Sequence, residues 1–192
     1  IKDKNIFDLN GHPLMAYTIA SAKSSGIFER VLVATDSKKY AEIALKYGAE
    51  VPSLRSEEIS GDRSPDFLWL EWALTSWNLT NYDALSILRP TSPFRSSEDI
   101  KKAWDEFKNF GKSDSIRAVT KTSIHPGKMW ISSGSIIQPI YPFKIDDIPW
   151  HSSQTSNLPE VYFQNASLEI AWTKSILRTS SIAGDIVQPY FS

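Results

Sequence analysis

The sequence predicts an α/β fold with a doubly wound, mainly parallel sheet and a smaller β-rich excursion. In the first 120 residues, short apolar runs alternate with helical patterns of about 10 to 15 residues, which is typical of βαβ units. After Lys121 the pattern changes, because five prolines interrupt short extended pieces between residues 126 and 159. The 192 residues suffice for one domain with its own core. We therefore expect a single domain over 1–192, with about 122–160 as the excursion.

Four helices are expected in the first 110 residues, and three of them have a start or stop signal. They cover residues 14–24, 38–47, 67–77 and 96–110. Pro13 stands near the start of the first helix, and Gly26 and Gly48 end the first and second. Ser96 and Asp99 have the spacing of a capping box at the start of the fourth.

Strands are expected at residues 31–35, 50–54, 83–88, 115–120, 161–172 and 186–190. The apolar runs at 31–35 and 83–88 are typical of strands buried on both faces. In an open α/β sheet, ligands bind beyond the carboxyl ends of the strands. The loops at 36–37 and 89–95 and the turn after Thr120 should therefore converge on one crevice.

Composition excludes several classes of function. The chain has no cysteine, which excludes disulfides, thiolate metal sites and cysteine nucleophiles. A net charge of −1 argues against a general nucleic-acid binder. No apolar run approaches the roughly 18 residues of a membrane span. The sequence also lacks the nucleophile elbow and the glycine-rich phosphate loops, and its three histidines are too scattered to indicate a metal site.

Cationic and amide side chains gather in the expected loops. They are Lys4, Asn5, Arg55, Arg89 and Arg95. Arginine and lysine are the usual partners of phosphates and carboxylates, so an anionic substrate would account for them. Taken singly, each is more often a solvated surface charge, and Asp36 is more often a helix cap than a ligand. Only their convergence in one crevice would indicate a site.

Five stretches of the chain match the motifs of one known family. They are Ile1-Lys2-Asp3-Lys4-Asn5-Ile6 with Leu9-Asn10-Gly11-His12-Pro13-Leu14, then Val33-Ala34-Thr35-Asp36, then Arg55 with Glu58 and Ser60-Gly61-Asp62, then Leu88-Arg89-Pro90-Thr91-Ser92-Pro93-Phe94-Arg95, and His125-Pro126-Gly127-Lys128-Met129. Together they resemble the acylneuraminate cytidylyltransferases. The resemblance implies a Rossmann-like nucleotidyltransferase fold, in which the excursion at 122–160 is a dimerisation or lid insertion and the protein is a homodimer.

The resemblance also implies a reaction and its residues. CMP would pass from CTP to an acidic, sialic-acid-like nine-carbon sugar, pyrophosphate would leave, and Mg²⁺ would assist, all in the cytoplasm. Lys4 and Arg89 would be catalytic. The nucleotide would be bound by Lys4, Asn5, Arg55, Asp62, Asp66, Pro90 and Thr91, and the sugar by Arg89, Gln164, Asn165 and Glu169. The metal ligands stay unknown.

The chain departs from the family pattern at the sugar side. Arg89 replaces a glutamine, and Glu169 stands where the family has an aromatic hydroxyl. The family's first strand with its phosphate loop, and its pair of metal-binding aspartates, are expected outside this sequence. Two alternatives therefore stay open. One is a related nucleotidyltransferase for another sugar or a sugar phosphate, and the other is a non-catalytic nucleotide- or sugar-binding homologue.

Six of the seven tryptophans divide into two groups. Trp69, Trp72, Trp77 and Trp104 have helical spacings that favour a role in the core rather than a stacking platform. Trp130 and Trp150 fall in the excursion, where a dimer seam is the preferred interpretation.

Overall fold

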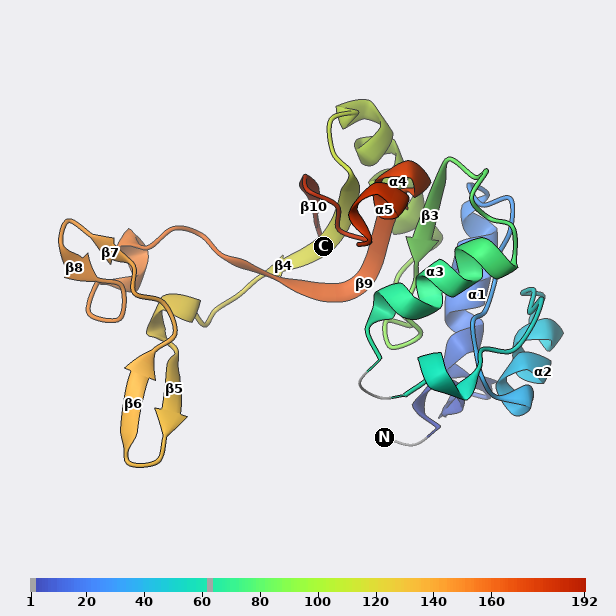
Figure 1. Ribbon diagram of the computed structural model, residues 1–192, viewed down its shortest axis with the longest axis horizontal. Helices are drawn as coiled ribbons and strands as arrows, with labels where there is room; N and C mark the ends of the chain where they lie inside the picture. Colours follow the sequence, from blue (N-terminus) through green and yellow to red (C-terminus); the bar gives the residue numbers. More distant parts are fainter. Residues whose placement is uncertain (1–2, 62–63) are drawn as a thin grey trace. The chain divides into compact units, whose positions relative to one another are not determined.

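A computed structural model describes residues 3–61 and 64–192 and divides the chain into two compact units (Figure 1). Unit 1 holds the described residues up to Ala118 together with Ala166–Tyr190. Unit 2 holds Val119–Asn165 and Phe191–Ser192. The division falls inside three strands.

A four-stranded sheet has the order β10-β4-β9-β3. Its strands are β3 (Ala84–Ile87), β4 (Ser115–Lys121), β9 (Tyr162–Trp172) and β10 (Val187–Phe191). The amide of Asp114 donates to the carbonyl of Ile186 (2.8 Å) and that of Ser192 to Val119 (3.2 Å), so β10 runs parallel to β4. β9 runs antiparallel to β3, with Ile87 opposite Glu169. The sheet is therefore mixed, and the expectation of a mainly parallel sheet is corrected, because β9 runs against its neighbours.

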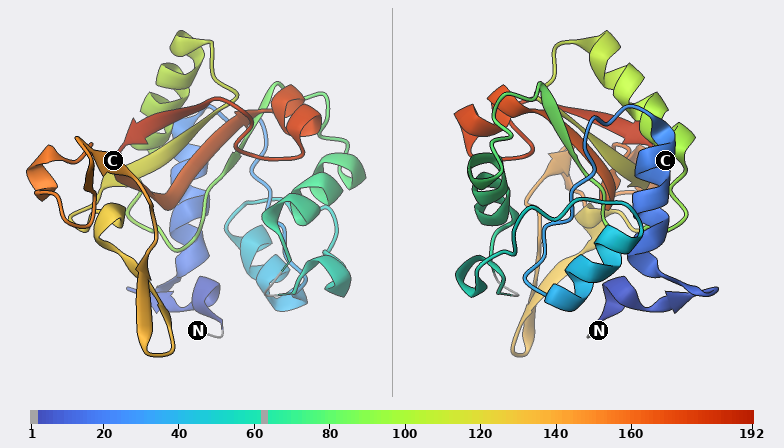
Figure 2. Two further views of the ribbon diagram at one scale, coloured as in Figure 1. Left: turned by 60° about the vertical axis from the view of Figure 1, so that its left-hand side comes forward. Right: turned by 90° about the vertical axis from the view of Figure 1, so that its right-hand side faces the viewer.

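Helices cover both faces of the sheet, as a doubly wound fold requires (Figure 2). α1 (Leu14–Ser25) and α4 (Ser97–Phe110) lie on one face, and α3 (Asp66–Ser76) and α5 (Thr173–Thr179) on the other. Alternate residues of β9 serve the two faces. Leu168 and Ile170 pack with the cluster that includes α4, whereas Ala171 packs with α3 and α5.

The extended segment 31–35 is less regular than expected. α1 and α2 (Lys38–Lys46) pack around it through Met15, Ile19 and Ala44. Leu32 forms only an isolated parallel bridge with Glu50, so the strands expected at 31–35 and 50–54 shrink to one bridge. No strand among the described residues pairs with the other edge of this segment, and a strand without partners on both sides is poorly defined.

Local signals account for most element boundaries. Gly26 ends α1 in the left-handed conformation (φ 68°), and Ser96 and Asp99 form the expected capping box of α4. Asn10 and Gly11 both have positive φ (53° and 86°) and make a two-residue turn between β1 (Asp8–Leu9) and β2 (His12–Pro13). The remaining small elements of unit 1 are the 3-10 helices η1 (Lys4–Ile6) and η2 (Glu57–Ile59).

Unit 2 is built from short hairpins. β5 (Trp130–Ser133) pairs with β6 (Ile136–Pro139), and β7 (Lys144–Ile145) with β8 (Ile148–Pro149). The 3-10 helices are η3 (Pro126–Lys128) and η4 (Thr155–Asn157). His125 links η3 to Pro159, because its Nδ1 accepts from the Gly127 amide (2.9 Å) and its Nε2 lies 3.1 Å from the Pro159 carbonyl oxygen.

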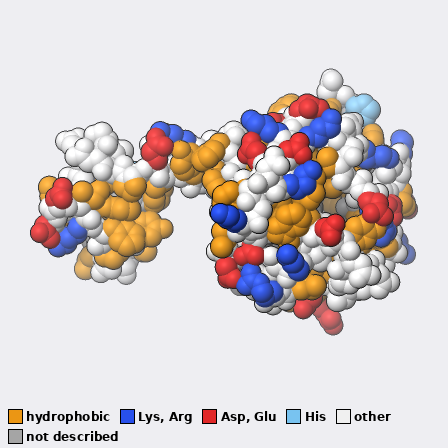
Figure 3. Space-filling model, turned by 90° about the horizontal axis from the view of Figure 1, so that it is seen from above, with side chains coloured by type: hydrophobic (Ala, Val, Ile, Leu, Met, Phe, Trp, Pro, Cys, Tyr) orange, Lys and Arg blue, Asp and Glu red, His pale blue; other side chains and the backbone are white. Residues whose placement is uncertain are grey.

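Hydrophobic side chains gather on the surface of unit 2 (Figure 3). Ile131 and Ile137 are each 58% exposed, Ile136 is 65% exposed, and Phe143 and Ile148 are about half exposed. Large apolar side chains exposed in such numbers are typical of interaction sites in soluble proteins. Within residues 3–61 and 64–192, no helix combines the length and the apolar character that crossing a bilayer demands.

Candidate functional site

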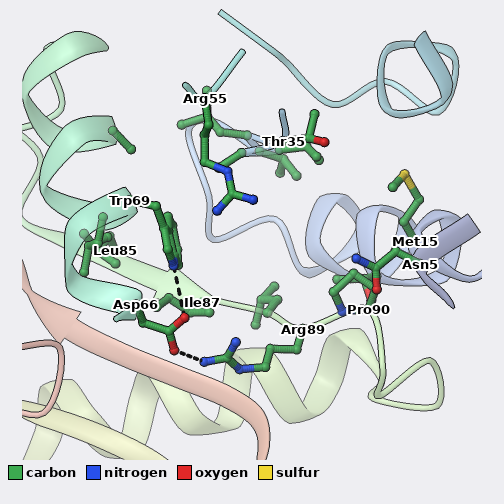
Figure 4. A pocket seen from close by; sticks show the side chains of 18 of the residues that line it. Asn5, Met15, Thr35, Arg55, Asp66, Trp69, Leu85, Ile87, Arg89 and Pro90 are labelled. Atoms are coloured by element: carbon green, nitrogen blue, oxygen red, sulfur yellow. Dashed lines mark hydrogen bonds and ion pairs between the residues drawn. The ribbon is translucent and has the colours of Figure 1, made fainter. Parts of the chain in front are cut away.

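A cavity of about 650 Å³ lies in unit 1 between the segment 31–35 and strand β3 (Figure 4). Its apolar walls include Ile19, Leu32, Leu74, Leu85 and Ile87. Its polar rim consists of Lys4, Asn5, Arg55, Asp66 and Arg89. These five residues come from four separate stretches of the chain, so the fold and not sequence proximity brings them together.

Lys4 and Asn5 reach the cavity from η1, which is fixed at its start. The Ile6 amide donates to the carbonyl of Asp3 (3.1 Å), and the Tyr40 hydroxyl donates to the Asp3 carboxylate (2.7 Å). Burial, together with the nearby Asp3 carboxylate, raises the pKa of Tyr40 to about 12, so its hydroxyl keeps the proton that it donates. η1 is thereby tied to α2, which holds Lys4 beside the cavity.

Arg55 directs its guanidinium into the cavity (Figure 4). The Arg55 amide donates to the Thr35 carbonyl (2.9 Å), which anchors the backbone at the end of segment 31–35. The Arg55 Nε is buried without a hydrogen-bond partner among the described residues. A buried donor without a partner is costly, and an anion in the cavity would satisfy it.

Asp66 joins Arg89 and Trp69 at the opposite side of the polar rim. Its carboxylate accepts from Arg89 Nη2 (2.5 Å) and from the Trp69 indole N–H (3.1 Å), as Figure 4 shows. Burial would raise the pKa of Asp66, but the hydrogen bonds from Arg89 and Trp69 outweigh burial and hold that pKa below its ordinary value. Trp69, interpreted from the sequence as a core residue, also lines the cavity and supports this carboxylate.

Arg89 also faces a buried carboxylate behind the rim. Glu169 on β9 is 6% exposed, and its Oε1 lies 3.7 Å from Arg89 Nη2. Its Oε2 is paired with Arg117 of β4 at 2.5 Å. Arg117 is not among the residues predicted from the sequence, although a single cation between the apolar residues Ile116 and Ala118 of a buried strand is a visible signal.

The loop from Arg89 to Arg95 is fastened by its last residue. Arg95 is 8% exposed and donates to the Ser167 carbonyl and, at 3.5 Å, to the Arg89 carbonyl. Burial lowers the pKa of Arg95 to about 10, so its guanidinium stays charged at neutral pH. Pro90 of this loop lines the cavity, whereas Thr91 is exposed and is not among the lining residues.

The structure therefore brings together most of the residues expected at the nucleotide. Lys4, Asn5, Arg55, Asp66, Arg89 and Pro90 share one cavity, and Glu169 adjoins Arg89 behind it. Asp62 lies outside the described residues. Gln164 and Asn165 belong to unit 2, where the Asn165 amide donates to the hydroxyls of Thr120 (2.9 Å) and Ser192 (2.7 Å). The roles of Thr91, Gln164 and Asn165 stay predictions.

The carboxylates of the described residues do not assemble a metal cage. No group of three or more Asp, Glu or His side chains within this part of the chain is placed to hold an ion. Asp66 is already engaged by Arg89 and Trp69. The metal ligands are therefore left unassigned.

Comparison with known proteins shows what this chain is similar to. The CMP-N,N'-diacetyllegionaminic acid synthase of Legionella pneumophila is 33% identical over 97% of this chain and 78% of its own length. The N-acylneuraminate cytidylyltransferase of Escherichia coli is 32% identical over 96% of this chain, which spans 42% of that relative's length.

Solved structures and the family profile agree with these relatives. A CMP:2-keto-3-deoxy-manno-octonic acid synthetase in complex with CTP covers 98% of this chain with a TM-score of 0.67 at 10% identity, which shows the same α/β fold. That match includes 83% of its own chain. The profile described as Cytidylyltransferase matches residues 1–126. The resemblance stated from the motifs is thus confirmed, and the chain belongs to the cytidylyltransferase family.

Proposed function

We propose that the chain transfers CMP from CTP to an acidic nine-carbon sugar and releases pyrophosphate. One observation carries the proposal, namely that Lys4, Arg55 and Arg89 converge on a single cavity from three distant parts of the chain. Both reactants are anionic, and cations fixed in a partly buried cavity stabilise anions more strongly than solvated ones do. The relatives' names, which include legionaminic, pseudaminic and N-acylneuraminic acids, indicate the class of sugar.

The reaction needs positioning more than covalent help from the protein. The anomeric hydroxyl oxygen of the sugar forms a bond to the α-phosphorus of CTP, and the bond from that phosphorus to the bridging oxygen of the β-phosphate breaks. Pyrophosphate carries the bonding electrons away, and the hydroxyl proton passes to solvent. Lys4 and Arg55 would neutralise the phosphate oxygens, with Asn5 as an amide donor beside them.

The opposite side of the polar rim would hold the sugar. Arg89 presents a planar guanidinium, which suits the two oxygens of a carboxylate. Because an arginine adds a full charge where relatives of the resembled family have glutamine, a sugar phosphate is the second candidate acceptor. Glu169 lies behind Arg89 on this side of the cavity, and Gln164 and Asn165 stay predicted from the sequence as further sugar ligands.

The apolar part of the cavity is proposed for a different purpose. β3 is the last strand in the order of the described sheet, and the facing edge of segment 31–35 is also without a strand partner in residues 3–61 and 64–192. Thr18, which is 8% exposed and lines the cavity, has a buried hydroxyl without a partner there. We propose that a further extended segment fills this slot, where the resemblance places the family's first strand, and leaves the polar rim to the substrates.

Three finer assignments accompany the proposal. Mg²⁺ would accompany the triphosphate, as it does in most phosphoryl transfers, but no step is assigned to it because the described carboxylates form no site. The exposed apolar surface of unit 2 would join two copies in a homodimer. The cytoplasm, where CTP is made, is the proposed location.

Pyrophosphate release tests the proposed function. The protein with its natural ends is incubated with each of the four nucleoside triphosphates and with N-acetylneuraminic acid, a legionaminic acid or a hexose 1-phosphate. Release with CTP and an acidic nine-carbon sugar is expected. Release only with the sugar phosphate would establish the second candidate, and CTP binding in calorimetry without any release would establish a non-catalytic binder.

A further inference from the structure

Two adjacent strands, β4 and β9, and the loop that follows β3 place three charged side chains on one face of the sheet. Ile87 of β3 lies opposite Glu169 of β9, so their side chains point to the same face, and Arg89 follows two residues after Ile87. On β4, Ile116 and Ala118 point into the cluster with α4, so Arg117 between them points to the other face. Arg89, Glu169 and Arg117 therefore meet on the face away from α4.

Glu169 joins the two arginines with a different oxygen for each. Its Oε2 is 2.5 Å from Arg117 and its Oε1 is 3.7 Å from Arg89. A carboxylate that is only 6% exposed is tolerated because it is paired, and the closer arginine supplies most of that compensation. The Arg117–Glu169 pair is thus a fixed unit, against which the guanidinium of Arg89 is oriented.

Hydrogen bonds through Arg95 hold the backbone of Arg89 beside the same stretch of β9. Arg95 donates to the carbonyls of both Arg89 and Ser167, and Ser167 is two residues before Glu169. The Ser86 hydroxyl donates to the Glu169 carbonyl at 2.9 Å. Both ends of Arg89 are therefore held relative to β9, although the residue itself sits in a loop.

The two carboxylates near Arg89 differ in exposure. The Asp66 side chain is 48% exposed and lies at the cavity, whereas that of Glu169 is 8% exposed and lies behind it. An arriving anion can take the place of the exposed carboxylate without leaving a buried charge unpaired. Exchange of the buried Glu169 would leave Arg117 without that compensation.

We propose that Glu169 and Arg117 form a positioning pair, which fixes Arg89 toward the acidic group of the sugar while Asp66 gives way to it. This inference rests on the proposed function of the cavity and deepens it. Glu169 then affects sugar binding through the orientation of the Arg89 guanidinium. Sugar selection is set in part by β4 and β9, beneath the loop that carries the contacting cation.

Steady-state kinetics of two single variants test the pair. Glu169→Gln removes the negative charge of the pair and Arg117→Met removes its positive charge, each with little change in side-chain volume. Because a charge-assisted contact contributes an affinity factor of about ten or more, we expect the KM for the acidic sugar to rise about tenfold. The KM for CTP should change less than about twofold, since Lys4 and Arg55 are untouched. Equal changes in both KM values would overturn the proposal.

A charge-reversed double variant separates positioning from stability. Arg117→Glu with Glu169→Arg restores the buried pair but places a cation beside Arg89. The thermal unfolding midpoint should recover relative to the single charge reversals, while the sugar KM should stay high. Recovery of both quantities would reduce the pair to a structural role and overturn the proposal.

A control comes from another ion pair of the sheet region, in which Asp114 is largely covered and Arg178 is 55% exposed. Asp114→Asn disrupts the contact with Arg178 (2.9 Å) at the start of β4, and neither residue lines the cavity. This variant should lower the unfolding midpoint without changing the sugar KM. A rise in sugar KM as large as that of Glu169→Gln would show that loss of stability alone explains the effect.

Binding measurements keep the inference separate from the proposed reaction. Calorimetry of N-acetylneuraminic acid with the wild-type protein in the presence of CTP needs no turnover. If wild type releases no pyrophosphate but binds the sugar about tenfold more tightly than Glu169→Gln does, the proposed function fails and the positioning pair stands. Equal sugar affinities, or none in either protein, would overturn the pair.

Discussion

Arg55 contributes a charge to the cavity that no described carboxylate pairs with directly. We expect Arg55→Met to raise the KM for CTP about tenfold and to leave the sugar KM nearly unchanged, because a charge-assisted contact to phosphate contributes about 1.5–3 kcal/mol. Initial-rate kinetics with each substrate varied measure both constants. Lys39→Met, an exposed cation of α2 outside the cavity, is the control. A CTP KM unchanged in Arg55→Met would remove Arg55 from the nucleotide site.

Asp114 fixes the turn that leads into β10. Its carboxylate accepts from the Ser175 hydroxyl (2.6 Å), from the amides of Asp185 and Ile186 (2.9 and 3.1 Å), and from Arg178. The hydrogen bond from Ser175, with those from the two amides, holds the pKa of Asp114 far below its ordinary value. The stability that Asp114 contributes is therefore complete above about pH 4, the unfolded value, and is lost as the pH falls further.

Thermal unfolding at two pH values measures that contribution. At pH 7, Asp114→Asn should lower the unfolding midpoint by about 3 °C or more, since it loses charge-assisted hydrogen bonds. The difference from wild type should shrink between pH 4 and pH 2, because the unfolded wild-type chain takes up a proton there. Asp105→Asn, in an exposed pair with Lys108, should change the midpoint little at either pH. A difference that grows toward pH 2 would contradict the assigned pKa direction.

Part of the candidate site could be predicted from single residues, and part could not. Lys4, Arg55 and Arg89 stand out as cations in loops between regular elements, so the sequence alone marks them. The contact between Arg117 and Glu169 joins residues 52 positions apart on neighbouring strands. The helical spacing of Trp69 from its apolar neighbours predicts a core residue, but the same spacing also fits a residue at the edge of a cavity. Such contacts depend on tertiary neighbours, which residue type does not encode.

At the scale of elements, the capping box of α4 gives a direct test. The Ser96 hydroxyl accepts from the Asp99 amide (3.0 Å), and the Asp99 carboxylate accepts from the Ser96 amide (3.0 Å). The hydrogen bond from the Ser96 hydroxyl is the main reason that the pKa of Asp99 lies below its usual value. Ser96→Ala should destabilise the protein by about 1 kcal/mol in urea unfolding. Ser97→Ala, one residue into the helix, should cost less than half of that, and equal losses would contradict the capping role.

Helices were predicted more fully than strands, for a physical reason. The helical spacing of apolar residues, the glycine stops and the capping box of α4 are local signals, and α1, α2, α3 and α4 begin and end within about two residues of their expected limits. α5 is not predicted, because its seven residues are too few for a periodic pattern. The segment 31–35 has the composition of a strand but only one bridge, because strand formation requires partners on its edges. Direction is likewise not local, and the reversed β9 could not be inferred from its own residues.

At the scale of the whole molecule, unit 2 carries the assembly prediction. The β5–β6 hairpin has two faces, with Trp130 and Ile137 on one and Ile131 and Ile136 on the other. Because tryptophan is enriched at interface centres, the face with Trp130 should lie in the dimer. Light scattering at micromolar concentration should show a dimer for wild type and a monomer for Trp130→Lys with Ile137→Lys. Ile131→Lys with Ile136→Lys should stay dimeric. A monomeric wild type would exclude the homodimer, and dissociation only in the second variant would move the interface to the opposite face.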